Sequence, residues 1–398
     1  MKKKIVFVIP SLDAGGGEKS LVNLLNCLDF TLYDVDLILF KKQGIFLNSV
    51  PKEVTIISIQ DDYIHFTKNV FRSILAFTIR LKIVLALHRI LFFLKSRRIK
   101  NSAQAEQYTW NNLSKSIAPF PNKYDQAIAF LEKSSIYLTV DKLNATSKIG
   151  WIHTNYASSG MNSDFDTNYF SQLNALVTVS PECHANLLSV FPQFSGKIKT
   201  IYNIVSPSII ESLSLKTATT DKRFSSFENT IVTVARLSYE KGCDLAIDAS
   251  RIMKGNNINF KWFIIGEGSE RLILEKQIQK YQLEENVFLI GLKENPYPYM
   301  KQCTVYVQPS RYEGKSIAIE EAKILQKPIV VTDFSTAKDQ IIAGKTGVIA
   351  DMTADGLAFA ISDVLKNSSL QVLLSSNLAK EDLGTENEIN KLYNILNC

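Results

Sequence analysis

The fold is decided by Lys4–Leu25, which reads KIVFVIPSLDAGGGEKSLVNLL. The apolar run Ile5–Ile9 predicts a short buried strand, which ends at Pro10. Three consecutive glycines follow, and after them apolar residues recur with the spacing of a helix. A strand that passes through a glycine-rich turn into a helix begins a βαβ unit. The sequence therefore predicts a parallel sheet covered by helices.

The same alternation of short apolar runs and helical patterns continues along the chain. In the first half the further predicted strands are Val35–Phe40, Val54–Ile59, Gln126–Phe130, Ile149–Ile152, Ala175–Val179 and Lys199–Tyr202. Residues 207–228 are rich in Ser, Thr, Lys and Asp and predict a linker. Beyond it the predicted strands are Ile231–Val234, Phe260–Ile265, Val287–Ile290, Val305–Gln308 and Ile329–Thr332.

This pattern predicts two doubly wound, Rossmann-like α/β domains. We expect them at residues 1–206 and 229–381, with a C-terminal helix at about 382–398 that packs back on the first domain. The 398 residues are 46% hydrophobic and 21% charged, which excludes a disordered chain. The five cysteines lack the spacing of a zinc site or disulfide framework and predict a reducing, cytoplasmic setting. The first apolar run is too short for a signal peptide.

Positive charge is concentrated in the first half of the chain. Residues 1–205 hold 23 Lys and Arg against 15 Asp and Glu, and residues 63–105 hold nine basic residues and no acidic one. No RNA-binding motif or zinc finger accompanies them, so nucleic acid is not an expected partner. Residues 66–100 mix these cations with Phe and Leu, which predicts peripheral contact with an anionic membrane surface. The alternative is a core helix with solvated ends.

Three loops at strand ends are candidates for binding a ligand, and the first two suit phosphate groups. Gly16 and Gly17 allow close backbone approach and stand before the N–H groups of a helix start. Arg236 and Lys241 follow the first strand of the second domain, where open sheets bind ligands, and fixed cations suit a diphosphate leaving group. Gly266 lies in a glycine-rich turn after the next strand. The alternatives are flexible or structural turns for the glycines and solvated surface charges for the cations.

The most specific motif is PSRYEGKSIAIEEAK, at Pro309–Lys323. Glu313 precedes a predicted helix, and Glu321 lies within it about two turns further on. Backbone N–H groups that suit an anion come from the helix start, at Gly314, Lys315, Ser316 and Ile317. Bound phosphate would repel a carboxylate at this helix start, so Glu313 is better placed to face the hydroxyl groups of a sugar.

The ordered set of motifs resembles the retaining glycosyltransferases of family 4, of bacterial surface-polysaccharide type. That family has the GT-B fold, in which two doubly wound Rossmann-like domains face each other across a cleft. The resemblance covers nearly the whole chain and also rests on Trp151-Ile-His153-Thr154, Val179-Ser-Pro181 and Ile201-Tyr-Asn203. The chain departs from the family after Gly314, where Lys315-Ser316 replaces the common Phe-Gly, and after Asn203, where Ile204 replaces glycine.

The resemblance implies a role for each candidate residue. The donor diphosphate is held by Arg236 and Lys241, and the backbone N–H groups of Gly16 and Gly17 face the donor diphosphate or sugar. The hydroxyl groups of the ribose contact Glu321, and those of the donor sugar contact Glu313. His153 lies beside the transferred sugar, although a buried structural histidine is the alternative. The backbone around Gly291 and Leu292 meets the base.

The implied activity is transfer of a sugar with retention, without a metal or other cofactor. A UDP- or GDP-linked sugar is the expected donor, and a glycan or polyprenyl-diphosphate-linked molecule the acceptor, at the inner face of a bacterial membrane. Asp34-Val-Asp36 and Asp164-Phe-Asp166 have the pattern of metal-binding pairs but are predicted to be surface acids. Two alternatives stay open: an epimerase or phosphorylase of the same architecture, and a non-catalytic nucleotide-sugar-binding protein.

Overall fold

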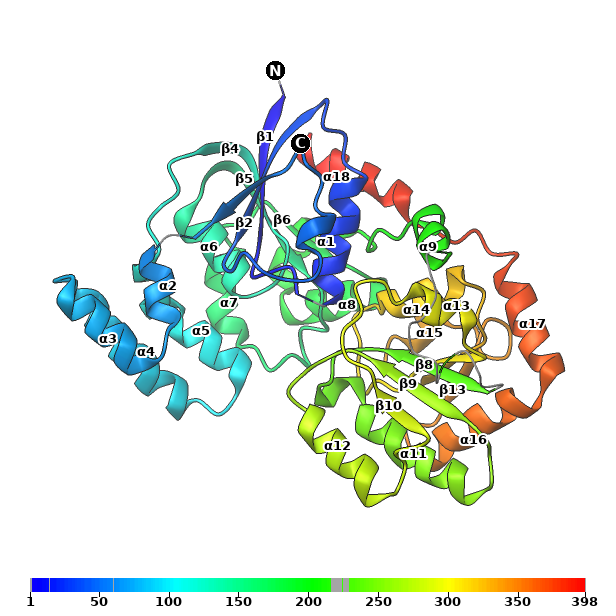
Figure 1. Cartoon of the computed structure of the whole chain (residues 1–398). Coiled ribbons are helices and arrows are strands. Elements are labelled where there is room, and N and C mark those ends of the chain that lie inside the picture. The colour runs from blue at the N-terminus through cyan, green and yellow to red at the C-terminus, as the bar shows by residue number, and fades with distance from the viewer. Residues whose placement is uncertain (1, 14, 60, 216–223, 225–228, 398) are drawn as a thin grey trace. The chain divides into compact units, whose positions relative to one another are not determined.

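The computed structural model describes residues 2–13, 15–59, 61–215, 224 and 229–397 and shows two parallel β-sheets (Figure 1). The chain divides into two compact units. The first is built from Met1–Asp13, Gly17–Tyr202 and Glu388–Cys398, and the second from Asn203–Asn387 together with residues 14–16. In each sheet the strands run outward in both directions from the unit's first strand, so the predicted pair of doubly wound α/β folds is confirmed.

The first sheet has seven parallel strands in the order β3-β2-β1-β4-β5-β6-β7. They are β1 (Lys3–Ile9), β2 (Tyr33–Leu39), β3 (Thr55–Ser58), β4 (Lys123–Ala129), β5 (Asn144–Ile152), β6 (Ala175–Thr178) and β7 (Ile198–Thr200). Its helices are α1 (Gly16–Asn26), α2 (Asp61–Thr67), α3 (Val70–Ile79), α4 (Ile83–Arg98), α5 (Ser102–Leu113), α6 (Ser134–Lys142), α7 (Ser163–Phe170), α8 (Pro181–Val190) and α18 (Ile389–Leu396). Val6 and Phe7 point to opposite faces of β1 and are both fully buried, because both faces of the sheet are covered.

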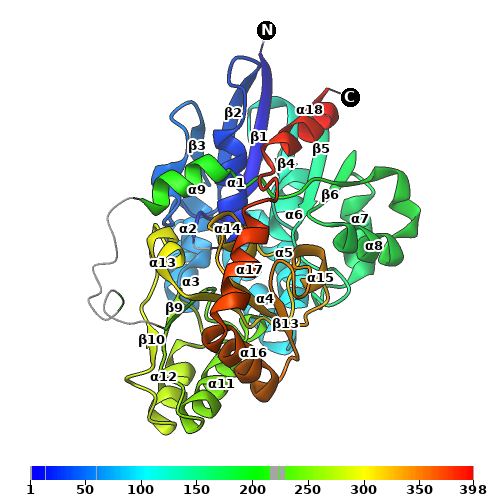
Figure 2. The same cartoon turned by 90° about the vertical axis from the view of Figure 1, so that its right-hand side faces the viewer.

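The C-terminal helix α18 lies beside β1, as both Figure 1 and Figure 2 show. The Lys3 ammonium donates a hydrogen bond of 2.9 Å to the carbonyl of Leu396, and the ring of Tyr393 stacks on Tyr33 with centroids 5.6 Å apart. The last residues therefore complete the unit in which the chain began.

The second sheet has six parallel strands in the order β10-β9-β8-β11-β12-β13. They are β8 (Thr230–Val234), β9 (Lys261–Ile265), β10 (Val287–Leu289), β11 (Val305–Gln308), β12 (Ile329–Thr332) and β13 (Val348–Ala350). Its helices are α9 (Pro207–Ser214), α11 (Cys243–Gly255), α12 (Arg271–Lys280), α13 (Tyr297–Gln302), α14 (Ile317–Ile324), α15 (Ala337–Gln340), α16 (Ala354–Lys366) and α17 (Ser368–Leu378). Separate hydrophobic cores cover the two faces, with Ile231 in one and Val232 in the other.

The start of the predicted linker is helical. Residues 207–214 form α9, with Pro207 at its first position, where the absent N–H costs nothing. Ile210 is buried in the same core as Phe263, so the Ser-rich segment hides a short amphipathic helix. Residues 216–223 and 225–228 of the predicted linker lie outside the described residues.

Helices α2 to α5 follow one another between β3 and β4. The pair α3 and α4, joined by residues 80–82, is called the hairpin below. Phe77 of α3 and Ala86 of α4 pack with Phe66 of α2 in a small hydrophobic core. None of the helices formed by the described residues has the length and hydropathy needed to cross a bilayer.

Candidate active site

In the second sheet, β8 and β11 are neighbours from which the chain winds in opposite directions. The loops that leave their carboxyl ends are therefore where an open α/β sheet binds its ligand. Arg236 and Lys241 lie in the loop after β8, and Glu313 in the loop after β11. The structure thus brings together two motifs that lie about seventy residues apart in the sequence.

The backbones of these two loops touch at Gly242. This residue has φ +63°, and a Cβ atom there would lie 1.9 Å from the carbonyl oxygen of Pro309. The side chain of Arg311 crosses between the loops and holds Asp244 with two hydrogen bonds, Nη1 to Oδ1 of 2.8 Å and Nη2 to Oδ2 of 2.6 Å. The pKa of Asp244 is lowered by its bonds to Arg311, although burial acts in the opposite direction. A glycine and a bidentate ion pair therefore fix one loop against the other.

Lys241 and Glu313 form an ion pair, with 2.6 Å between Nζ and Oε2. The second carboxylate oxygen of Glu313 accepts hydrogen bonds of 2.7 Å from the Ser310 hydroxyl and 3.2 Å from the Gln308 amide. Gln308 is held in turn by the Tyr306 hydroxyl at 2.6 Å. Glu313 is only 8% exposed, so its position is fixed by the protein itself. The sequence analysis assigned Lys241 to the diphosphate and Glu313 to the sugar of a donor. In the structure the two side chains form one ion pair.

Arg236 is exposed, and its guanidinium forms no ion pair with any residue that the structure describes. Lys315 is mostly buried and lies 3.9 Å from the carboxylate of Glu320. Arg236 therefore shares the loop after β8 with Lys241 and is accessible to an anion, without an ion-pair partner among the described residues.

The start of α14 differs from expectation at Ser316. Its N–H donates to Oε1 of Gln340 at 2.9 Å, and the Gln340 amide returns a bond of 2.8 Å to the Ser316 carbonyl. The Ser316 N–H is therefore bonded to Gln340 in this structure, and a role of Ser316 in binding a donor stays a prediction. Ile317 is buried, and Gly314 is half-buried next to Glu313. Gln340 comes from a later helix, which is why the local motif did not reveal it.

Glu321 is 1% exposed, and its carboxylate accepts a hydrogen bond of 3.0 Å from the hydroxyl of Tyr297. Gly266 serves close packing, because a Cβ atom there would lie 1.8 Å from the carbonyl oxygen of Ala235. The Gly266 N–H donates to the carbonyl of Gly291 at 3.1 Å, and the side chain of Leu292 is 40% exposed. The turn at Gly266 thus brings the loops after β8, β9 and β10 together.

The first unit has a corresponding strand-end cluster between β1, β4 and β5. Gly17 stands near the start of α1, and a Cβ atom there would lie 2.7 Å from Leu131 and 3.8 Å from Nδ1 of His153. Gly16 is exposed and has open space around its Cα. The structure therefore places Gly17 close to His153, although β4 lies between the strands that precede them.

The imidazole of His153 is neutral at pH 7. It packs on the ring of Phe130, 5.0 Å between centroids, and its Nε2 is buried without a hydrogen-bond partner among the described residues. Burial lowers the pKa of His153 to about 3, although a hydrogen bond to the Phe130 backbone acts in the opposite direction. His153 can therefore exchange hydrogen bonds with a ligand but does not supply positive charge.

Glu132 joins this cluster and was missed from the sequence. Its carboxylate accepts a hydrogen bond of 3.1 Å from the backbone N–H of His153, and burial raises the pKa of Glu132. The next residue, Lys133, has φ +62° and an ion pair of 2.8 Å with Glu106. Its position in the sequence could have indicated it, because Glu132 follows a buried strand as His153 does.

In each Asp-x-Asp pair only the first residue is the surface acid that we expected: Asp34 and Asp164 are exposed, whereas the second aspartate is buried. Asp36 is 4% exposed and accepts a 2.7 Å hydrogen bond from Tyr124. Asp166, in α7, is 1% exposed and accepts bonds of 2.6 Å from Tyr137 and Tyr156, and burial raises its pKa. Tyrosine hydroxyls satisfy these carboxylates, so they can be buried. Within the described residues, no three His, Cys, Asp or Glu side chains are grouped to hold a metal ion.

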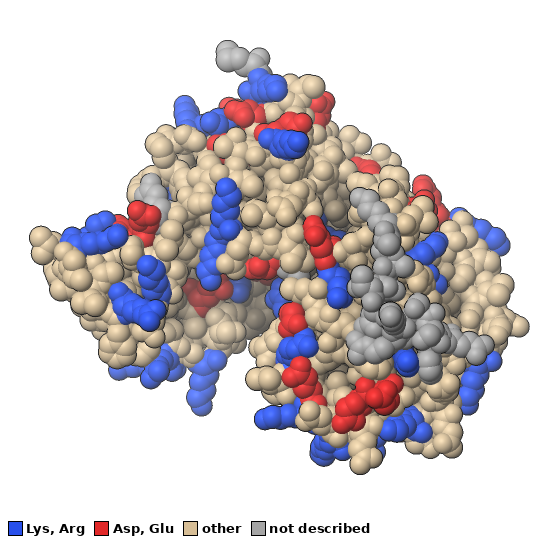
Figure 3. Space-filling model, viewed as in Figure 1, with Lys and Arg blue, Asp and Glu red and all other residues tan. Residues whose placement is uncertain are grey.

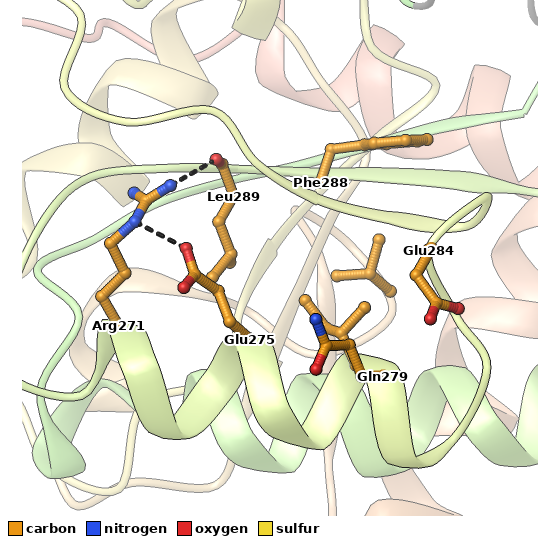
Figure 4. Close-up of a pocket in the computed structure, with 8 residues that line it drawn as sticks. Arg271, Glu275, Gln279, Glu284, Phe288 and Leu289 are labelled. Atoms are coloured by element: carbon orange, nitrogen blue, oxygen red, sulfur yellow. Dashed lines mark hydrogen bonds and ion pairs between the residues drawn. The ribbon is translucent and has the colours of Figure 1, made fainter.

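A separate hollow of about 240 Å³ lies between α12 and β10 (Figure 4). Arg271 is held there by the carbonyl of Leu289 at 3.2 Å and by Glu275 at 2.8 Å. Its other lining residues are Ile278, Gln279, Glu284, Val287 and Phe288. None of the residues predicted to bind a donor lines this hollow.

Comparison with known proteins gives a family match for part of the chain. Residues 218–381 match the family model described as glycosyl transferases group 1. The poly(ribitol-phosphate) alpha-N-acetylglucosaminyltransferase of Staphylococcus aureus is 26% identical over 251 residues, 62% of this chain and 49% of that enzyme. In Campylobacter jejuni, an N-acetylgalactosamine-N,N'-diacetylbacillosaminyl-diphospho-undecaprenol 4-alpha-N-acetylgalactosaminyltransferase is 26% identical over 198 residues, 48% of this chain and 52% of the relative.

The solved structures show the fold. Anabaena HepE, in complex with UDP-glucose, superposes with a TM-score of 0.71 at 15% identity and covers 99% of both chains. At this identity the likeness is evidence for the shared GT-B fold alone. The matches to the first three curated relatives span about half of their length, 45% to 50%.

Proposed function

We propose that this protein is a glycosyltransferase that moves a sugar from a nucleotide diphosphate donor. The observation that carries the proposal is the Lys241–Glu313 ion pair, which joins the loops at the carboxyl ends of β8 and β11, with the exposed Arg236 in the same loop as Lys241. The site lies inside residues 218–381, which match the group 1 glycosyl transferases. A cation next to a carboxylate suits a ligand in which a diphosphate is joined to a sugar, because the cation can bind the diphosphate and the carboxylate can bind the hydroxyl groups.

Lys241 can serve the protein and a ligand at once. Its ammonium carries three N–H donors, and one of them is directed to Glu313. Its side chain is a quarter exposed, which leaves the remaining donors accessible. Together with Arg236 it would bind the diphosphate, and both cations would stabilise the negative charge that gathers on the leaving group as the glycosidic bond breaks.

Glu313 is proposed to bind a hydroxyl group of the donor sugar. A carboxylate offers about four acceptor positions, and Lys241, Ser310 and Gln308 occupy three of them. Because these three contacts hold the carboxylate of Glu313 in one orientation, they also fix the direction in which its fourth acceptor position points. Within the same proposal, Glu321 binds the ribose, and the backbone of Gly291 and Leu292 meets the base.

The finer features of the reaction are also proposals. We infer retention of configuration, no metal requirement, and a UDP- or GDP-linked donor. The neutral imidazole of His153 is proposed to form a hydrogen bond with the transferred sugar. The Campylobacter relative is named for a diphospho-undecaprenol acceptor, which supports a glycan or polyprenyl-diphosphate-linked acceptor and a position at the inner face of the membrane.

The test is a comparison of ligands that differ only in the diphosphate. We expect UDP or GDP, and sugars linked to one of them, to raise the melting temperature of the protein, whereas uridine and guanosine leave it unchanged. Arg236→Ala should abolish the shift. Release of nucleoside diphosphate only in the presence of acceptor then separates a transferase from an epimerase. Equal shifts with nucleoside and nucleoside diphosphate would contradict the proposed site.

A further inference from the structure

The hairpin of α3 and α4 exposes a large apolar surface. Phe71 is 80% exposed, Leu81 in the connecting turn is 85% exposed, and Val84 is 67% exposed. Other exposed apolar residues of the hairpin are Leu75, Ile79, Ile83, Leu87, Ile90, Leu91 and Leu94. Many exposed apolar side chains on one pair of helices mark a place where something else binds.

The other side of the hairpin is already used by the protein. Phe77 and Ala86 pack on Phe66, and the guanidinium of Arg89 lies 5.5 Å from the Phe66 ring. Arg89 also donates a hydrogen bond of 3.1 Å to the carbonyl of Lys68. The inward face is thereby fixed, so the exposed residues form the opposite face. On α3 they recur every fourth residue, and on α4 every third or fourth residue.

Cations accompany this apolar face, although fewer than the sequence suggested. Arg89 points inward, and Lys82 is paired with Asp62 at 2.7 Å. Seven other cations are exposed and form no ion pair with the described residues: Lys68, Arg72, Arg80, Lys95, Arg97, Arg98 and Lys100. No acidic residue occurs between residues 63 and 105. Figure 3 shows Lys and Arg atoms separated by uncharged surface over α3 and α4.

We propose that the hairpin docks on an anionic lipid surface, with its apolar side chains in the interfacial region and its free cations at the lipid phosphates. Two short helices with an apolar face and surrounding cations have the chemistry of an interfacial element. A second copy of the chain is a poorer occupant, because a symmetric contact through this face would bring the same unpaired cations together. The inference does not depend on the enzymatic activity.

The experiment measures binding of the full chain to phosphatidylcholine vesicles with and without phosphatidylglycerol. We expect binding only when phosphatidylglycerol is present, and weaker binding as salt is added. Each cation near an anionic surface contributes about a fivefold gain, so reversing Arg72, Arg80 and Lys95 to Glu should weaken partitioning by about a hundredfold or more. The matched control reverses three exposed lysines elsewhere in the first unit, Lys52, Lys123 and Lys199.

The apolar contribution is tested separately. Phe71→Glu with Leu87→Glu should weaken binding at least tenfold, because both side chains leave water on docking. Phe359→Glu with Val372→Glu is the control, since these residues are similarly exposed in the second unit. The proposal is overturned if the chain binds neutral and anionic vesicles equally well, or if the hairpin and control variants lose the same amount of vesicle binding. It is also overturned if the chain forms a dimer without lipid and Phe71→Glu dissociates that dimer.

Discussion

Replacing Lys241 by Ala removes the cation that Glu313 contacts and leaves the carboxylate with only its neutral partners, Ser310 and Gln308. The side chain of Glu313 is 7% exposed and that of Lys241 is 25% exposed, so the pair lies between a surface and a buried ion pair. Surface pairs contribute about 0–1 kcal/mol, whereas breaking a buried pair costs about 3–5 kcal/mol. We therefore expect Lys241→Ala to lower the free energy of unfolding by about 2 kcal/mol.

The same substitution should have a separate effect on catalysis. Loss of one electrostatic donor to a leaving group costs about 2–4 kcal/mol in the transition state, which corresponds to roughly a 30- to 1000-fold lower kcat/KM. Adding Glu313→Gln removes the unpaired charge but restores no cation. The double variant should therefore regain stability in urea unfolding while release of nucleoside diphosphate stays low.

Two results would refute this reasoning independently. Turnover of Lys241→Ala within threefold of the wild type would remove Lys241 from the diphosphate site. A double variant no more stable than Lys241→Ala would show that the charge of Glu313 was not what destabilised the single variant.

Three further predictions concern the cation, the metal and the histidine. Arg236→Ala should lower kcat/KM by a similar factor of roughly 30 to 1000 with an unchanged melting temperature, because Arg236 is exposed; near-normal turnover would contradict its role. A chelator should leave turnover intact, and activity that vanished and returned with magnesium or manganese would end the metal-free mechanism. The folded pKa of His153 is about 3 and the unfolded pKa about 6.5, so the unfolded chain binds more protons between these values and stability falls as pH falls. From pH 7 to pH 5 the wild type should lose about 2 kcal/mol more than His153→Gln in urea unfolding; parallel losses would show that His153 titrates normally.

The sequence predicted the sheets well because their strands are buried on both faces and appear as continuous apolar runs. Strand β13 was missed, since Val348–Ala350 is only three residues long and pairs along one side with β12. Helix α9 was hidden by its Ser and Pro composition.

For the candidate site, the residues on the loops were found but their partners were not. Lys241 and Glu313 were assigned separately because nothing local shows that β8 and β11 are neighbours. Gln340 and Glu132 act through contacts with distant segments, at Ser316 and His153. The burial of Asp166 depends on tyrosines from two other parts of the chain, which a count of neighbouring polar residues cannot reveal.

The return of the chain to its first unit makes the second unit an inserted domain. The chain leaves the first unit at Tyr202 and re-enters at Glu388, and the Tyr202 N–H donates to the Glu388 carboxylate at 2.9 Å. The two crossing points are therefore adjacent, so a few glycines could join them after removal of Asn203–Asn387. Such a shortened protein would retain the hairpin and α18 but lack the cation–carboxylate site, which would separate membrane attachment from donor binding in one molecule.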